Sequence, residues 1–315
     1  MNIDFHTHVK VAKISRFMPE YFEDMMKEAK SAGLTALCMT EHFNTFQSMD
    51  TYDYLKEHYS YQSEYYDVNG LKVFTGMEID VKEVGHILII AQRDDIVNMR
   101  KRLSSFDKKP DFIPFKELMD LADQYNTLRI GGHPLRESTP LVHHNSEQLK
   151  RLDAFDLNGR DLYAQGQHPY IEQLETFASG LDMPIVGGSD THQYLQYGSI
   201  MNETSRECET INELKEMITA GDYRVKVSRE LDLKVKSASL VKKLIKGSLD
   251  TNGVATMYEE VALKNASAKA YYFRSGEIHF FFFVAYTRKV GINCFCRDNN
   301  ICDSIIWRKH WYRFS

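Results

Sequence analysis

The segment that decides the fold class opens the chain, where residues 3–8 read IDFHTH. Ile3 and Phe5 alternate with polar residues as in a short strand, and His6 and His8 follow. Residues two apart on an extended chain point the same way, so both imidazoles can face one metal ion. Taken alone, such a pair is weak evidence for a metal site, and its weight depends on the rest of the chain.

Short apolar runs alternate with amphipathic segments as far as about residue 230. This alternation is typical of βαβ units and a parallel sheet. About seven strands allow an open doubly wound sheet or a closed barrel, but no glycine-rich phosphate loop follows the first strand to support the open form. The expected strands cover residues 3–5, 34–40, 71–79, 86–91, 128–131, 152–157 and 184–186, and the expected helices cover residues 19–33, 115–122, 170–178, 211–220 and 240–245.

Histidines and carboxylates gather where these strands end, or in one case where a strand begins. The carboxyl ends of parallel strands meet at one edge, so these side chains are expected to converge there. Imidazole with carboxylate suits zinc, iron or manganese better than calcium or magnesium. A single histidine of this kind would be an ordinary surface or core residue, whereas the whole set predicts a metal site. The expected ligands are His6, His8, His42, Glu78, His86, His133, Asp190 and His192.

The order of these motifs resembles the PHP (polymerase and histidinol phosphatase) family. DFHTH, TEH, GMEID with a following His, GGHP and GSDTH carry the resemblance, over roughly residues 1–225. It implies a metal-dependent phosphoesterase with an α/β fold, a distorted, TIM-barrel-like (β/α)7 barrel whose metal site lies at the strand C-termini. It also implies how the ligands divide: His6, His8, Glu78 and Asp190 hold one ion, Glu78 bridges to a second ion that His86 and His133 complete, and His42 and His192 belong to a third.

The chain departs from the family pattern after the first motif. Members with three metals have a further His or Asp there, but residues 9–16 read VKVAKISR. We therefore expect two divalent ions, Mn, Zn or Fe, with a third site left incomplete. Lys10 projects near that third position, either to supply positive charge to the site or as a solvated loop lysine.

The expected reaction is hydrolysis of a phosphate ester of a small molecule or nucleotide. Bound divalent ions lower the pKa of water and neutralise phosphate oxygens. Asp190 or His192 could relay a proton to the leaving alcohol. Arg136 and Arg160 each follow an expected strand and could bind the phosphate, because a guanidinium fork matches its geometry; the alternative for both is a surface salt bridge. Together with Lys10 they are the expected substrate-binding residues.

The composition of the chain limits which other classes of protein it can belong to. The net charge is -5 and 43% of the residues are hydrophobic, which indicates a globular protein and argues against a dedicated duplex-DNA binder. The chain starts without a signal peptide and contains no apolar run of about 18 residues, so a cytoplasmic protein with no membrane partner is expected. No Ser nucleophile motif is present and the Cys residues lie outside the motifs, which disfavours covalent catalysis.

The C-terminal segment differs in charge from the rest. Residues 231–315 carry 14 Lys/Arg and 7 Asp/Glu, a net +7, whereas residues 1–230 carry 25 and 37, a net −12. We therefore expect a phosphoesterase domain over residues 1–230 and a C-terminal extension of unassigned structure over 231–315. A small phosphorylated substrate is favoured over nucleic acid. Two alternatives stay open: a non-catalytic metal-binding or nucleic-acid-associated module, and a hydrolase of a C–N bond with the same ligands.

Overall fold

The chain divides into two compact units, residues 1–243 and 244–315. The computed structural model describes residues 1–249, 268–275, 278–287 and 289–296. The last helix, α9 (Leu231–Gly247), contains the helix predicted at 240–245 and crosses the boundary between the units. The second unit holds a three-stranded antiparallel sheet of β12 (Ala268–Ser275), β13 (Ile278–Thr287) and β14 (Lys289–Cys296). In the described part of the chain, no helix is both long and apolar enough to cross a membrane. The domain boundary expected near residue 230 stays a prediction.

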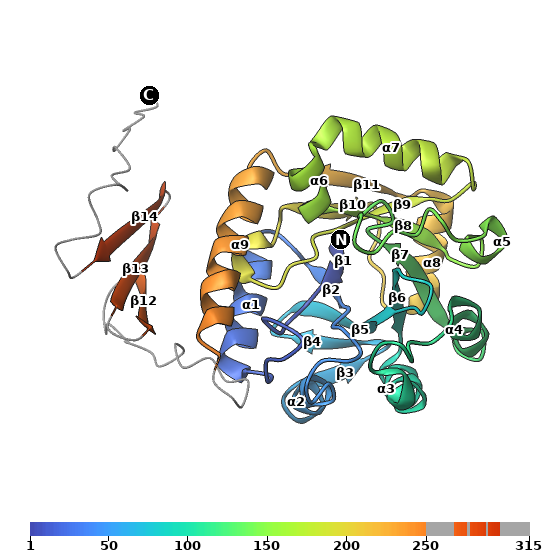
Figure 1. Ribbon diagram of the computed structural model, residues 1–315, viewed down its shortest axis with the longest axis horizontal. Helices are drawn as coiled ribbons and strands as arrows, with labels where there is room; N and C mark the ends of the chain where they lie inside the picture. Colours follow the sequence, from blue (N-terminus) through green and yellow to red (C-terminus); the bar gives the residue numbers. More distant parts are fainter. Residues whose placement is uncertain (250–267, 276–277, 288, 297–315) are drawn as a thin grey trace. The chain divides into compact units, whose positions relative to one another are not determined.

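The first unit is a barrel-shaped sheet surrounded by helices (Figure 1), which confirms the predicted α/β barrel. The sheet closes where β9 returns to β1: the Asp190 N–H donates to the His6 carbonyl (2.8 Å), and the His8 N–H donates to the Thr191 carbonyl (2.9 Å). In spatial order, the strands are β11 (Tyr223–Val227), β10 (Ile200–Thr204), β1 (Asn2–Thr7), β2 (Ala36–Met39), β5 (Leu71–Asp80), β6 (His86–Ala91), β7 (Thr127–Gly132), β8 (Ala154–Asn158) and β9 (Ile185–Gly188), with β3 (Ser60–Gln62) and β4 (Tyr65–Val68) paired onto β5.

The sheet is mixed rather than parallel throughout. β1, β2 and β5 run parallel, as do β7, β8 and β9, but β6 is antiparallel to both of its neighbours. A tight turn joins β5 to β6, in which the Val81 N–H donates to the Gly85 carbonyl (3.0 Å). This connection is too short for the crossover that a parallel pair needs. The expectation of a parallel sheet therefore does not hold at β6, and the reversal explains why His86 lies at the start of its strand and still reaches the edge where the expected ligands meet.

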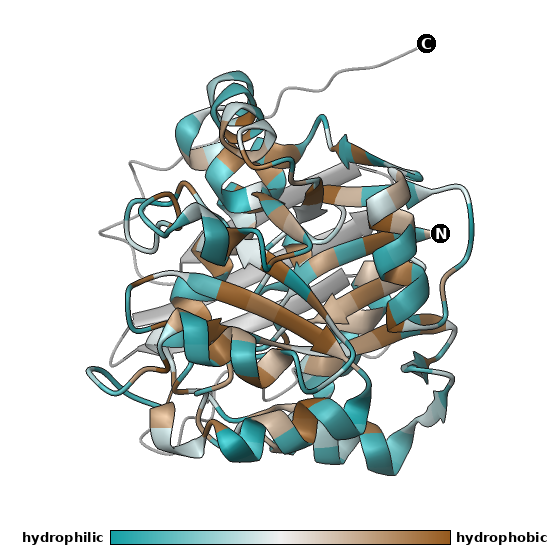
Figure 2. Ribbon diagram, turned by 90° about the vertical axis from the view of Figure 1, so that its right-hand side faces the viewer, coloured by the Kyte–Doolittle hydropathy of each residue, from teal (hydrophilic) through white to brown (hydrophobic). Residues whose placement is uncertain are grey.

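The helices bury one apolar face each against the strands. In α1 (Pro19–Ser31) the residues that recur at helical spacing, among them Tyr21, Met25 and Ala29, are all buried. Figure 2 shows brown, apolar residues concentrated in the strands and both colours on the outer helices. The other helices are α2 (Asp50–His58), α3 (Arg93–Arg102), α4 (Phe115–Ala122), α5 (Ser146–Leu149), α6 (Gly159–Gln165), α7 (Gln167–Ser179) and α8 (Ile211–Ala220), with 3-10 turns at Ser104–Phe106 and Tyr194–Gln196.

Helix α8 seals the barrel interior at the end away from the ligands. Its buried face, Ile211, Leu214, Met217 and Ile218, belongs to the same apolar cluster as residues of the barrel strands such as Ile3. A capping box begins the helix: Thr210 accepts from the Glu213 N–H, and the Glu213 carboxylate accepts from the Thr210 N–H. The barrel interior is therefore apolar at this end among the described residues, and the expected ligands lie at the opposite edge.

Candidate metal centre

The structure brings all eight expected ligands together at the carboxyl edge of the barrel. They come from the ends of β1, β2, β5, β7 and β9 and from the start of β6. Seven are buried and His42 is nearly so. Potential ligand atoms lie within 4.8 Å of one another in three groups: His6, His8 and Asp190; Glu78, His86 and His133; and His8, His42 and His192.

Glu78 lies at the centre of the cluster and is 1% exposed. Its Oε1 is 2.5 Å from His86 Nδ1 and 3.2 Å from His133 Nε2. Its Oε2 is 2.7 Å from His42 Nδ1 and 3.4 Å from His8 Nε2. The two oxygens therefore face different groups of histidines, which is the geometry that a bridging carboxylate needs.

The backbone at the ends of β1, β7 and β9 departs from regular strand geometry. The register of β1 against β2 shifts between Asp4 and Thr7, so Phe5 joins the apolar core while the adjacent His6 joins the cluster. His133 (φ 32°) and Asp190 (φ 54°) lie in the left-handed region, which is uncommon for residues other than glycine. Such backbone persists only where the surroundings hold it, and it concentrates at functional sites.

Three of the expected imidazole ligands have their second ring nitrogen hydrogen-bonded to a neighbouring side chain. A metal-ligating histidine usually donates its other N–H to such a partner, which sets its tautomer and ring orientation. The contacts are His6 Nδ1 with Asp156 Oδ2 (2.8 Å), His86 Nε2 with Asp80 Oδ1 (3.0 Å) and His133 Nδ1 with Thr139 Oγ1 (3.2 Å). In addition, His8 Nδ1 lies 3.5 Å from Glu41 Oε1.

None of these four partners was predicted from the sequence. Glu41 and Asp80 stand inside the TEH and GMEID motifs, and Asp156 lies near the end of β8, so the strand-end rule applied to β8 would have found it. Glu41 is held by backbone groups. Its Oε2 accepts the N–H groups of Val9 (3.0 Å) and Lys10 (2.9 Å), and these contacts keep the loop after β1 beside the loop after β2.

The pair of His6 and Asp156 depends on a close backbone approach at Gly188. A Cβ at that position would lie 2.5 Å from His6 Cβ and closer still to Asp156 Oδ1. Gly188→Ala is therefore expected to lower the free energy of unfolding by roughly 1–3 kcal/mol and to weaken metal binding. Urea denaturation and metal titration measure the two effects.

Gly180→Ala is the matched control for this prediction. The nearest atom to a Cβ there is 3.5 Å away and φ is −63°, so an alanine fits. If Gly188→Ala behaved like Gly180→Ala in both measurements, the close packing around His6 would have no energetic importance.

In the metal-free protein, the cluster contains both protonated histidines and ionised carboxylates. Burial disfavours charge throughout, yet Asp156 and Asp190 raise the pKa of His6 well above its usual value, and Glu78 and Asp80 raise the pKa of His86 to about 9. The pKa of His8 is also raised. Conversely, burial lowers the pKa of His42, His133 and His192, so these three imidazoles are neutral. Protonated histidines thus offset the buried carboxylates where cations would otherwise do so.

Metal loading is therefore expected to release protons. At pH 6, His6, His8 and His86 are protonated, and each must lose its proton to bind an ion, so full loading should release about three protons. As pH rises through about 9, His86 loses its proton without metal, so the apparent affinity should increase and proton release should fall. Calorimetry in buffers of different ionisation enthalpy counts the protons; a pH-independent affinity would contradict these charge states.

The three expected substrate-binding residues have different surroundings. Lys10 is buried, and its Nζ donates to the carbonyls of Phe46 (2.8 Å) and Gln47 (2.9 Å). Arg160 is exposed on α6, and its backbone N–H donates to Asn158 Oδ1 (3.0 Å). Arg136 alone contacts an expected ligand: its Nη2 lies 2.8 Å from Asp190 Oδ2.

The donor set fits divalent metal ions. Every candidate atom is an imidazole nitrogen or a carboxylate oxygen, as zinc, manganese and iron prefer. The Glu78 carboxylate is buried among these nitrogens, with Oε2 3.4 Å from His8 Nε2 and 2.7 Å from His42 Nδ1. A buried charge is costly unless it is paired, and a bound cation would offset that cost.

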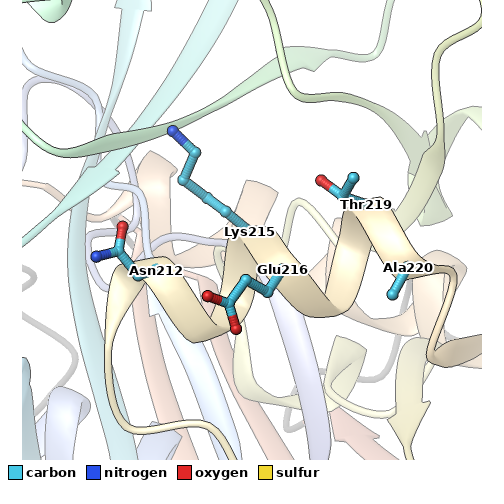
Figure 3. Close-up of a pocket in the computed structure, with 5 residues that line it drawn as sticks. All are labelled: Asn212, Lys215, Glu216, Thr219 and Ala220. Atoms are coloured by element: carbon cyan, nitrogen blue, oxygen red, sulfur yellow. The ribbon is translucent and has the colours of Figure 1, made fainter.

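A shallow hollow elsewhere on the first unit shows no comparable chemistry. It runs along α8 and is lined by Asn212, Lys215, Glu216, Thr219 and Ala220 (Figure 3). Lys215 Nζ donates to the carbonyl of Thr127, at the amino end of β7, so the hollow lies at the edge opposite the cluster.

Comparisons with known proteins agree with this fold. Residues 5–160 match the model of the PHP domain. The structure is similar to PsfC from Pseudomonas syringae PB-5123, with a TM-score of 0.60, 19% identity and coverage of 77% of this chain and 97% of PsfC. It is also similar to endonuclease Q from Pyrococcus furiosus, with a TM-score of 0.51, 16% identity and coverage of 71% of this chain and 58% of that chain. A structure of endonuclease Q bound to a 27-mer duplex with an abasic lesion gives a TM-score of 0.52, 18% identity and coverage of 72% of this chain and 58% of that chain. No curated protein matches the sequence. At these identities the structural likeness shows the fold alone.

Proposed function

Because residues 5–160 are a PHP domain, we propose that this chain is a metal-dependent phosphoesterase that hydrolyses a phosphate ester of a small molecule. A single observation carries the proposal: eight His, Asp and Glu side chains meet at one edge of the barrel, around Glu78. A module that only needed metal for stability would require one closed site rather than several adjoining groups that share a carboxylate.

We assign the ligands to two ions. The first is held by His6, His8, Asp190 and Glu78, and the second by Glu78, His86 and His133. The third group shares His8 with the first, and Glu41 lies beside His8 Nδ1, which leaves Nε2 for one ion only. His42 and His192 alone are a weak pair, which supports two ions of Mn, Zn or Fe and leaves His192 available for proton transfer.

When bound, the ions would activate a water molecule and neutralise the phosphate oxygens. His192 is the better of the two predicted proton carriers. Arg136 and His6 keep the pKa of Asp190 well below its usual value despite burial, so that carboxylate stays ionised and is a poor acid. His192 is assigned to neither ion, and its ring packs against His8 with ring centroids 4.0 Å apart, so it lies beside the first ion, where it can pass a proton from the activated water to the leaving oxygen.

The acidic first 230 residues, with a net charge of −12, favour a small phosphorylated substrate over duplex DNA. The likeness to endonuclease Q supports a second candidate, a nucleic-acid phosphodiester, although this chain covers only 58% of that protein. A C–N bond is a third candidate, because the same ligands serve such hydrolases.

The test is a substrate panel on protein of known metal content. The panel holds phosphate monoesters, phosphodiesters, an abasic duplex and amide substrates, each assayed with added Mn²⁺ or Zn²⁺. We expect turnover of phosphate esters that follows metal content. Metal-loaded protein that cleaved only amides, or cleaved nothing, would overturn the proposal.

We further propose that the C-terminal segment takes no part in the site. Every expected ligand lies at or before His192, so truncation after Gly247 is expected to leave metal content and phosphoesterase activity unchanged and to raise solubility. Elemental analysis and the assay above measure this. Loss of metal from a truncated protein with an intact circular dichroism spectrum would show that the removed segment completes the site.

A further inference from the structure

Arg136 lies in the turn after β7, where its N–H donates to the His133 carbonyl (3.0 Å). Its guanidinium is already held on two sides. Nε donates to both oxygens of Asp161 (3.1 Å each), and Nη2 donates to Asp161 Oδ2 (2.9 Å) and Asn158 Oδ1 (3.1 Å). Nη2 also donates to Asp190 Oδ2 (2.8 Å). The Arg136 side chain is 16% exposed, and the Asp161 and Asp190 side chains are 6% and 4% exposed, so this network is shielded from water.

Asn158 and Asp161, the groups that hold Arg136, lie at the start of α6. Asn158 is the N-cap of that helix, and its Oδ1 accepts the N–H groups of Arg160 (3.0 Å) and Asp161 (3.3 Å) as well as Arg136 Nη2. Asp161, in the first turn, presents both carboxylate oxygens to the guanidinium. The start of α6 therefore holds the Arg136 guanidinium in place, and the guanidinium also contacts Asp190 in the segment after β9.

The two oxygens of Asp190 have different neighbours as a result. Oδ2 accepts from Arg136, whereas Oδ1 lies 3.4 Å from His8 Nε2 and 3.8 Å from His6 Nε2. Only Oδ1 is aimed at the first metal group. A carboxylate without such a partner could rotate about its terminal bond, offer both oxygens or turn away from the histidines.

We propose that Arg136, anchored by Asp161, is a positioning residue that makes Asp190 a one-oxygen ligand for the first ion. This replaces the phosphate-binding role that the sequence indicated for Arg136, and it rests on the proposed assignment of Asp190 as a ligand. Arg is suited to this task because its planar fork binds one carboxylate through two nitrogens and still donates to a second. Asp161 acts through Arg136 and touches neither ion nor substrate.

The test compares Asp161→Asn and Arg136→Lys in the full chain. The first keeps the shape of Asp161 and removes its charge; the second keeps the charge of Arg136 and removes its fork. The matched controls are Arg151→Lys and Asp123→Asn. They alter an Arg–Asp pair at the surface, in which Arg151 Nη2 and Asp123 Oδ2 lie 2.7 Å apart. Mn²⁺ affinity is measured by competition with a chelator in the absence of substrate, and the Co²⁺ absorption spectrum reports the ligand geometry.

We expect both site variants to bind Mn²⁺ about 10–100-fold more weakly, to change the Co²⁺ spectrum and to lower kcat with little change in KM, while the control variants match the wild type. Unchanged Mn²⁺ affinity in both site variants would overturn the proposal. Unchanged affinity together with a raised KM would instead indicate that Arg136 binds the phosphate of the substrate. If Arg136→Lys fails to fold, Asp161→Asn decides the question. The affinity and spectrum need no turnover, so absence of phosphoesterase activity would count against the proposed function alone.

Discussion

Glu78→Gln is expected to abolish hydrolysis, with a loss of at least about 10³-fold in turnover, because water without its metal partners returns to a far higher pKa. An amide keeps the size of the side chain but is a poor metal ligand. Glu78 faces the ligands of both proposed ions, with His86 Nδ1 2.5 Å from one oxygen and His8 Nε2 3.4 Å from the other. The variant should therefore lose more activity than a change at any ligand that serves one ion, such as His133→Ala.

Elemental analysis and turnover are measured together for this variant. Glu117→Gln is the control, since Glu117 is exposed on α4. Turnover near that of the wild type with full metal content would show that Glu78 does not bridge two ions.

Removal of metal by a chelator is expected to eliminate activity entirely and to lower the melting temperature. An ion that binds only the folded protein stabilises it by about 2.7 kcal/mol at 100 times its Kd. For a chain of this size, each kcal/mol corresponds to roughly 2–4 °C. Addition of Mn²⁺, Zn²⁺ or Fe²⁺ should restore both activity and melting temperature. The ion that restores them most fully is the one that the site prefers.

The metal-free protein should still fold, because imidazolium groups such as His86 offset the buried carboxylates in place of cations. Circular dichroism of the stripped protein checks this point. Activity that survived complete removal of metal would exclude metal-dependent hydrolysis.

That the eight expected ligands lie together could be predicted from the sequence, because strand ends are local features. An apolar run marks each strand, and the polar residue that follows it must lie at the sheet edge. The helices α4 and α8 were predicted with the bounds that the structure has, since their apolar spacing is regular. By contrast, β10 reads IMNET and β11 reads YRVKV, too short and too polar to stand out as buried strands, and both were missed.

The partners of the ligands depend on tertiary register and could not be read locally. Asp156 meets His6 across 150 positions of sequence, and Asp161 meets Arg136 across 25. No periodicity within one strand or helix records such a contact. The same holds for the direction of β6: the sequence marks a strand there but not that a tight turn at Val81–Gly85 reverses it.

The apolar face of α8 has a consequence for how ions would exchange. Leu214 and its neighbours fill the barrel interior at the end opposite the expected ligands, so we expect ions and substrate to approach from the carboxyl edge. A phosphate group bound over the ions would then lie between them and solvent, and bound product should slow the exchange of metal.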